Sequence, residues 1–278
     1  MNLFSASTVP AHRRFVLLAP SHIETPGALS KAVSDSGEHA RLLAEAQRLR
    51  GRLYLADGAI KPWQLTPDAR HLQPADRSSF HLLSLDSTGH VAACTRYLQH
   101  SPNVAFSDLD LSRTPPASNS TSGPLLRNAV EGELGRAREL GYVFVEMGGW
   151  AITEALRCST EAVRMVVTLY ALGRIMGGAL GVSTATTRHG SSSILRRLGA
   201  SSLVDGNDSA GTYFDRNFEC EMELLRFNSD RPNAKYEEAI QRCQNILAHT
   251  PIIVPEKSSV PMPQVQVPAL SGLWQNLA

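Results

Sequence analysis

The residues best suited to chemistry form a short polar turn, Arg157-Cys158-Ser159-Thr160, that opens a segment predicted to be helical over 161–176. The first N–H groups of a helix have no partner inside it, and the helix dipole places positive charge beside them. An arginine next to such N–H groups adds the charge and donors that phosphates require. These four residues are therefore predicted to bind a phosphate or pyrophosphate. A helix cap made by Ser159 or Thr160 is the alternative, and it is compatible with phosphate binding.

A glutamate stands inside the apolar run Tyr142–Ile152 that precedes this turn. Burying a carboxylate is costly unless the group is paired or used in chemistry. Glu146 could take the proton of an attacking amine, with its pKa raised by burial. It could equally form a structural ion pair with Arg96 or Arg50. Both interpretations stay open at this point, and an arginine could serve both by orienting the glutamate.

Two glycines, Gly148 and Gly149, follow this glutamate in the same run. A backbone without Cβ atoms can approach a ligand closely, and its N–H groups could meet the oxyanion of a reacting thioester. A β-bulge with no ligand is the alternative. We favour the ligand because the phosphate-type turn lies close by in sequence.

These residues need a framework of strand, turn, helix, strand and helix to bring them together. The run Tyr142–Ile152 is typical of a strand, and 161–176 of a helix that is apolar on almost all sides. A second β-like run, Ala179–Thr186, leads to a short helix, Ser191–Leu198, which Gly199 ends. The apolar helix favours a buried core, although the same wall could line a tunnel for an acyl chain. The turn before the short helix could offer a hydroxyl to a departing thiol.

The flanking sequence completes the expected elements. Apolar spacing and turn residues predict a helix over Glu38–Ala56, a hairpin of Phe80–Leu85 and His90–Leu98, a helix from Pro124 to Gly141, a strand over Phe218–Phe227 and a helix over Lys235–Ala248. Residues 99–123 and the segment after Pro251 are expected to be irregular. The predicted organisation is an irregular extension over 1–36, one domain over 37–229, and a helix with a proline-rich tail over 230–278.

Composition narrows the class of protein. The 278 residues carry a net charge of +1, which gives no sign of a nucleic-acid or anionic-membrane partner. The four cysteines have no C-x-x-C spacing, so a zinc site is not expected. The N-terminal apolar run, Phe15–Ala19, is too short to span a bilayer and precedes no convincing cleavage site, so we expect a cytoplasmic protein without a membrane span.

The order of these elements resembles the GNAT acyltransferase fold over about Glu38–Phe227. Within that superfamily it is similar to acyl-homoserine-lactone synthases and long-chain N-acyl amino acid synthases. The resemblance is carried by Arg50-x-x-x-Tyr54, by Gly89-His-Val-Ala-Ala-Cys-Thr-Arg96 and by Val145-Glu146. It implies an α/β (α+β) fold: a mixed central sheet, flanked by helices, whose central strands splay apart.

The resemblance also implies a function and a site. The function is transfer of an acyl group, with long chains among the candidates, from acyl-CoA or acyl carrier protein to the amine of a small acceptor such as an amino acid. No permanently bound cofactor and no metal are expected. The implied site comprises Glu146, Gly148 and Gly149 for catalysis, Arg157, Cys158, Ser159 and Thr160 for the donor, and Arg96, Trp63, Arg50 and Tyr54 for the substrate.

The sequence departs from the family pattern at three places, one of which is the acidic run expected near Asp68–Asp76, which is diluted here. Gly148-Gly149-Trp150 stands where the lactone synthases commonly have Ser-Arg-Phe, and the Gly-rich phosphate turn is reduced to Arg157–Thr160. Plain N-acyl transfer therefore fits better than lactone formation. An acyl-homoserine-lactone synthase, or a catalytically silent GNAT-like domain that binds an acyl carrier, is the alternative.

Overall fold

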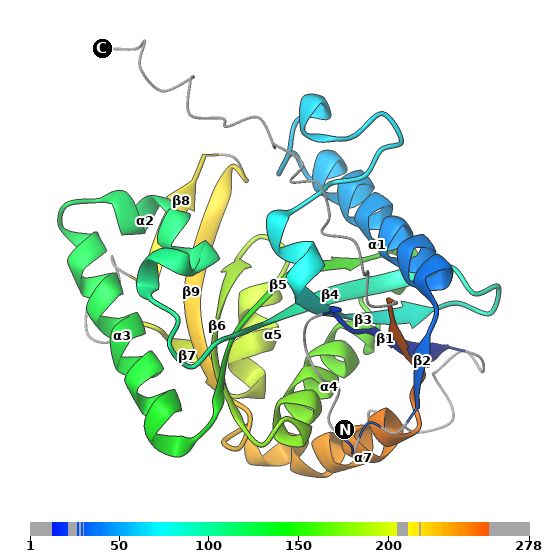
Figure 1. The fold of residues 1–278 in the computed structure, drawn as a ribbon. Helices are drawn as coiled ribbons and strands as arrows, with labels where there is room; N and C mark the ends of the chain where they lie inside the picture. Colours follow the sequence, from blue (N-terminus) through cyan, green and yellow to red (C-terminus); the bar gives the residue numbers. More distant parts are fainter. Residues whose placement is uncertain are drawn as a thin grey trace.

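A ten-stranded mixed sheet carries the site, with strand order β2-β10-β1-β3-β4-β5-β6-β9-β7 and β8 paired to β9 (Figure 1). The computed structural model describes residues 13–21, 27, 29, 31–204, 211–216 and 218–255. The strands are β1 (Arg14–Leu18), β2 (Ala32–Ser34), β3 (Ser79–Leu85), β4 (Val91–His100), β5 (Val143–Ile152), β6 (Ala179–Thr186), β7 (Ser201–Ser202), β8 (Thr212–Asp215), β9 (Cys220–Asn228) and β10 (Ile252–Val254).

Helices cover both faces of this sheet. They are α1 (Ser36–Ala56), α2 (Pro115–Ser118), α3 (Ser122–Leu140), α4 (Glu161–Ile175), α5 (Ser191–Leu198) and α7 (Glu237–Ala248), with short 3-10 turns η1 (Pro62–Gln64), η2 (Pro74–Ser78), η3 (Phe106–Asp108), η4 (Asp110–Arg113), η5 (Glu154–Leu156) and η6 (Ala234–Tyr236). Helices α1 and α3 pack on one face, while α4, α5 and α7 pack on the other. No helix in the described ranges is both long enough and apolar enough to cross a membrane.

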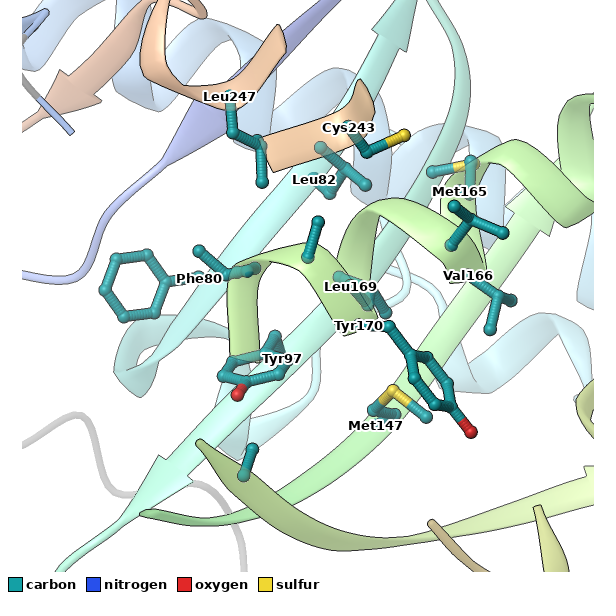
Figure 2. Close-up of a cluster of buried hydrophobic side chains, with 14 of the residues drawn as sticks. Phe80, Leu82, Tyr97, Met147, Met165, Val166, Leu169, Tyr170, Cys243 and Leu247 are labelled. Atoms are coloured by element: carbon teal, nitrogen blue, oxygen red, sulfur yellow. The ribbon is translucent and has the colours of Figure 1, made fainter. Parts of the chain in front are cut away.

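The largest core lies between the sheet and the pair α4 and α7. Figure 2 shows four side chains of α4 packed against the strands and against α7: Met165, Val166, Leu169 and Tyr170 meet Phe80, Leu82, Tyr97 and Met147 on one side and Cys243 and Leu247 on the other. Almost the whole circumference of α4 is buried, which explains why its sequence shows so little polar periodicity. The core interpretation of this helix is confirmed.

The expected irregular N-terminal segment was wrong for Arg14–Leu18 and Ala32–Ser34. Strand β1 lies inside the sheet, antiparallel to β3 and parallel to β10. Its side chains are buried on both faces of the sheet, and such a strand reads as a continuous apolar run without alternation. Strand β10, just after Pro251, was missed for the same reason, so the segment expected to be a tail begins with sheet structure. Residues 256–278 and 1–12 lie outside the described residues.

The segment expected to be loop over 99–123 is in part regular. It holds the end of β4, the turns η3 and η4, helix α2 and the first turn of α3. The short turns η3 and η4 and helix α2 are too short to show an apolar period in the sequence, so they could not be predicted from it. Their position matters, because η4 borders the site.

Candidate functional site

The two central strands diverge in the middle of the sheet. Strands β5 and β6 pair in parallel from Val143 with Ala179 to Met147 with Ser183, and no further. Beyond that pair β5 continues along β4, and β6 continues along β9. The Ser183 hydroxyl donates a hydrogen bond to the Met147 carbonyl at 3.1 Å, which joins the last paired residues of the two strands. The predicted splaying therefore occurs, and it begins after Met147, so that Gly148 is the first residue of β5 without a partner in β6.

A cleft of about 1650 Å³ fills the space between the parted strands. Its walls come from both faces of the sheet. Arg96 and Asp110 line it on the side of α1 and α3, whereas Val166 and Leu169 of α4 line it on the opposite side. Ligand pockets for small molecules commonly measure about 300–1000 Å³, so this one has room for two substrates or one long substrate. A passage through the sheet also lets two reactants approach each other from opposite faces.

The charge of the cleft is strongly positive among the described residues. Six arginines line it against three aspartates, and no lysine or glutamate does: Arg96, Arg113, Arg157, Arg188, Arg197 and Arg216 against Asp57, Asp110 and Asp215. The apolar part lies deeper, where α4 and α5 contribute Ala162, Val163, Val166, Leu169, Ile194 and Leu195. A ligand with an anionic end and an apolar end matches this distribution.

The glycine pair forms a β-bulge at the point of divergence. Register shifts by one residue between the pairs Cys94 with Ala151 and Arg96 with Gly148, and Gly149 has a φ of +62°. A Cβ on Gly149 would lie 3.1 Å from Nη1 of Arg50. A β-bulge is therefore present at the glycine pair. Both glycines also line the cleft, and their contact with a ligand stays a prediction.

We expect Gly149→Ala to lower the free energy of unfolding by about 1–2 kcal/mol, because an L-residue resists this left-handed backbone. The crowded Arg50 guanidinium adds to the effect. Gly132→Ala is the matched control, since Gly132 lies in α3 with nothing within 4 Å of its added Cβ. Alanine should stabilise that helix by up to about 1 kcal/mol. Urea denaturation measures both, and equal midpoints for the two variants would contradict the account.

A buried ion-pair network lies under the bulge. Arg50 donates to both oxygens of Asp76, at 3.0 Å and 2.6 Å, and both side chains are 2% exposed. Burial alone would raise the pKa of Asp76, but the hydrogen bond from Arg50 and its charge hold that pKa below its usual range. Gln47 donates to the same carboxylate. Arg50 does not line the cleft, so its predicted contact with substrate has no support from this geometry.

Arg96 reaches from this network into the cleft. Its Nη1 donates to Gln73 at 3.0 Å and its Nη2 donates to Asp110 at 3.0 Å, while Nη1 lies 3.7 Å from Asp76. Arg113 donates to the other oxygen of Asp110. Asp110 is therefore a carboxylate held between two guanidinium groups at the wall of the cleft. Sequence reasoning missed Asp110 and Arg113, because they lie in a stretch with no periodic pattern.

Glu146 does not point into the cleft. Its carboxylate accepts hydrogen bonds from the backbone N–H groups of Asp110 and Leu111, each at 2.9 Å, and lies 2.9 Å from Nε2 of His100. Burial alone would raise its pKa, but these partners hold the pKa below the usual value. The expected rise was wrong, and the side chain in contact with the carboxylate is His100 rather than Arg96 or Arg50. Glu146 fastens the turn η4, which carries Asp110.

We expect Glu146→Gln to lower the free energy of unfolding at pH 7 by about 1–3 kcal/mol, because two buried N–H groups lose a charged acceptor. The folded pKa lies below the ordinary 4.5, so this stabilisation is present above 4.5 and is lost as the pH falls through the folded value. Urea titrations at pH 7 and at lower pH should show the gap between wild type and variant narrowing. A gap that is independent of pH would refute this role.

The polar turn 157–160 begins helix α4 at the mouth of the cleft. Cys158 has a φ of +63°, the left-handed conformation that a glycine usually supplies. The Ser159 hydroxyl accepts a hydrogen bond from the N–H of Glu161 at 3.1 Å, whereas the N-cap residue is Thr160, whose side chain makes no cap hydrogen bond. Arg157, Cys158 and Ser159 line the cleft, and Thr160 does not. Phosphate binding by this turn stays a prediction.

The two aromatic candidates lie in different environments. The Tyr54 hydroxyl donates to the Trp150 carbonyl at 3.3 Å, and burial raises the pKa of Tyr54 to about 12. Tyr54 lines the cleft and stays protonated at neutral pH. Trp63 is 80% exposed on η1 and does not line the cleft. Its predicted contact with the substrate has no support from the described contacts. No group of three potential metal ligands exists within the described ranges.

Known proteins were compared with this chain. No family model and no curated protein matches the sequence. Among solved structures, the CoA-dependent acyl-homoserine lactone synthase BjaI, determined with SAM and isopentyl-CoA, aligns at a TM-score of 0.51 and 12% identity over 87% of this chain and 92% of its own. The acyl-homoserine lactone synthase LasI aligns at 0.47 and 15% identity, over 82% and 94%. FeeM, an N-acyl amino acid synthase from uncultured soil microbes, aligns at 0.41 and 11% identity, over 79% and 91%.

The alignment with BjaI establishes the fold. It spans most of both chains, and the chain therefore has the GNAT-like fold that the sequence resemblance implied. The expected class, a mixed central sheet flanked by helices with splayed central strands, is confirmed. At this level of identity the likeness concerns the fold, and function has to be argued from the site.

Proposed function

We propose that this protein is an N-acyltransferase that moves an acyl group from a phosphate-bearing thioester carrier to the amine of a small acceptor. The observation that carries the proposal is the cleft that crosses the sheet where β5 and β6 stop pairing. Its arginine-rich mouth suits the phosphates of coenzyme A, and its apolar depth along α4 suits an acyl chain. The neighbour BjaI, described as CoA-dependent, agrees with such a donor.

The acceptor side favours a zwitterion. Asp110 offers a carboxylate to an ammonium group, while the guanidinium groups of Arg113 and Arg96 beside it offer donors to a carboxylate. An amino acid has both charges on one carbon, which fits paired charges of this kind. Arg96 then both positions Asp110 and faces the acceptor.

The reaction in such a site is aminolysis of the thioester. The neutral amine nitrogen attacks the carbonyl carbon, a C–N bond forms, the C–S bond breaks, and the proton that the nitrogen loses ends on the departing thiolate. Backbone N–H groups along Gly148–Trp150, on the strand edge that β6 has left, are the proposed donors to the oxyanion. Asp110 replaces Glu146 as the proposed group that holds the amine and receives its proton, since Asp110 lines the cleft and Glu146 does not.

An acyl-homoserine lactone synthase is the second proposal, because BjaI carries that description and shares the fold. Mass spectrometry of lipid extracts from cells that overexpress the protein separates the two. A new N-acyl amino acid supports the first proposal and a lactone supports the second. Cells that express the Arg96→Ala variant are the control. Extracts with no new product would favour a GNAT-like domain that binds a carrier without turnover.

A further inference from the structure

Three basic side chains at the mouth of the cleft converge on a single residue, Asp57. Nη2 of Arg157 lies 3.6 Å from one carboxylate oxygen, and Nε2 of His189 lies 3.5 Å from the other. Nη1 of Arg188 donates to the backbone carbonyl of Asp57 at 3.3 Å. All four residues line the cleft.

These residues come from three separate segments. Asp57 ends helix α1, Arg157 follows β5 and η5, and the pair Arg188-His189 follows β6. Strands β5 and β6 are the two that part to form the cleft. The carboxylate of Asp57 therefore connects the basic groups beyond one strand with those beyond the other.

The contacts to this carboxylate are loose. Both are longer than an ordinary hydrogen bond, and the side chains of Arg157 and His189 are 45% and 43% exposed. Exposed pairs of this kind contribute little to stability. Arg157 faces this carboxylate, and Arg188 donates to the backbone carbonyls of Asp57 and Glu219, so two arginines share one aspartate here. An anion with more charge and more oxygens would bind this trio better than Asp57 does.

We propose that Asp57 occupies an anion site in the free protein and that a phosphate of the donor displaces it, binding Arg157, Arg188 and His189. This inference rests on the proposed phosphate-bearing donor. It extends the predicted turn 157–160 to residues beyond the other strand. Under this proposal Asp57 competes with the phosphate of the donor for the same basic side chains. A ligand without phosphate would not displace Asp57.

Calorimetric titration of the full chain with free coenzyme A tests this, without acyl group or acceptor. Asp57→Asn should bind coenzyme A about two- to fivefold more tightly, as expected for removal of one partly exposed competing charge. Arg188→Ala should bind it less tightly. Pantetheine, which has no phosphate, should bind the wild type and Asp57→Asn equally. Asp68→Asn is the matched control, since Asp68 pairs with Arg48 outside the cleft.

The inference is overturned if Asp57→Asn binds coenzyme A no better than wild type, or if wild type binds none. Thermal unfolding shows whether the variant is folded; if it is not, unchanged affinity in Arg188→Ala overturns the proposal instead. The titration requires no turnover. If the affinities are as predicted but no acyl transfer to any amine occurs, the anion site is supported and the proposed function is refuted. If acyl transfer occurs but Asp57→Asn binds coenzyme A as the wild type does, the proposed function is supported and the anion site is refuted.

Discussion

Replacing Asp76 by alanine is expected to lower the free energy of unfolding by about 3–5 kcal/mol, because it leaves the Arg50 guanidinium buried and without its charge partner. Arg50 is 2% exposed and makes two hydrogen bonds to that carboxylate. Arg96 lies 3.7 Å from it and would lose a second favourable charge. Urea denaturation followed by circular dichroism measures the loss.

Two further variants make this result decisive. Asp76→Asn keeps the shape of the side chain and removes only its charge, so it should lose less stability than alanine and serves if alanine prevents folding. Asp68→Ala removes an exposed carboxylate that pairs with Arg48 and Arg70, and its urea midpoint should stay close to wild type. A wild-type midpoint for Asp76→Ala would mean that the buried pair does not stabilise the packing of α1 against η2.

The Arg96→Ala variant is expected to lower kcat/KM for the acceptor by about 100-fold or more. Removing one partner of a partly desolvated, hydrogen-bonded charge pair costs about 2–5 kcal/mol, and each 1.4 kcal/mol corresponds to about tenfold. The loss should appear for the acceptor, because Arg96 holds Asp110 and Gln73 on that side of the cleft. Affinity for coenzyme A should stay near the wild-type value.

Steady-state kinetics with a thiol-release assay, combined with calorimetry, checks both halves of this prediction. Arg41→Ala is the matched control, since Arg41 is an arginine of α1 that pairs with Glu38 and Glu45 outside the cleft. An unchanged kcat/KM for the acceptor in Arg96→Ala, or an equal loss of coenzyme A affinity, would place Arg96 elsewhere than in the acceptor subsite.

The strongest parts of the sequence prediction concern segments with a clear period. The helix expected over 161–176 and the strand over Ala179–Thr186 match α4 and β6 closely, because each has a long apolar pattern and a defined end. The divergence of β5 from β6 followed from the family resemblance, and Gly148-Gly149 comes directly after the last paired residue of β5. Strands β1 and β10 were missed because short runs that are buried on both faces show no alternation.

The partners of the site residues were harder to predict. Glu146 is bound by His100 and by two N–H groups of η4, a turn of four residues with no sequence signal. Arg50 finds Asp76 across 26 residues of chain. Such pairs depend on how distant segments pack, and a single sequence does not record that packing. For the same reason, the sequence did not predict that Asp110 lies at the cleft or that Arg157, Arg188 and His189 meet at Asp57.

A crystal structure with a non-hydrolysable acyl-coenzyme A analogue tests the central claim most directly. The account predicts the thioester position beside Gly148 and Gly149, the acyl chain along Val166 and Leu169, and a phosphate at Arg157. Ordered analogue bound anywhere other than between the parted ends of β5 and β6 would contradict it.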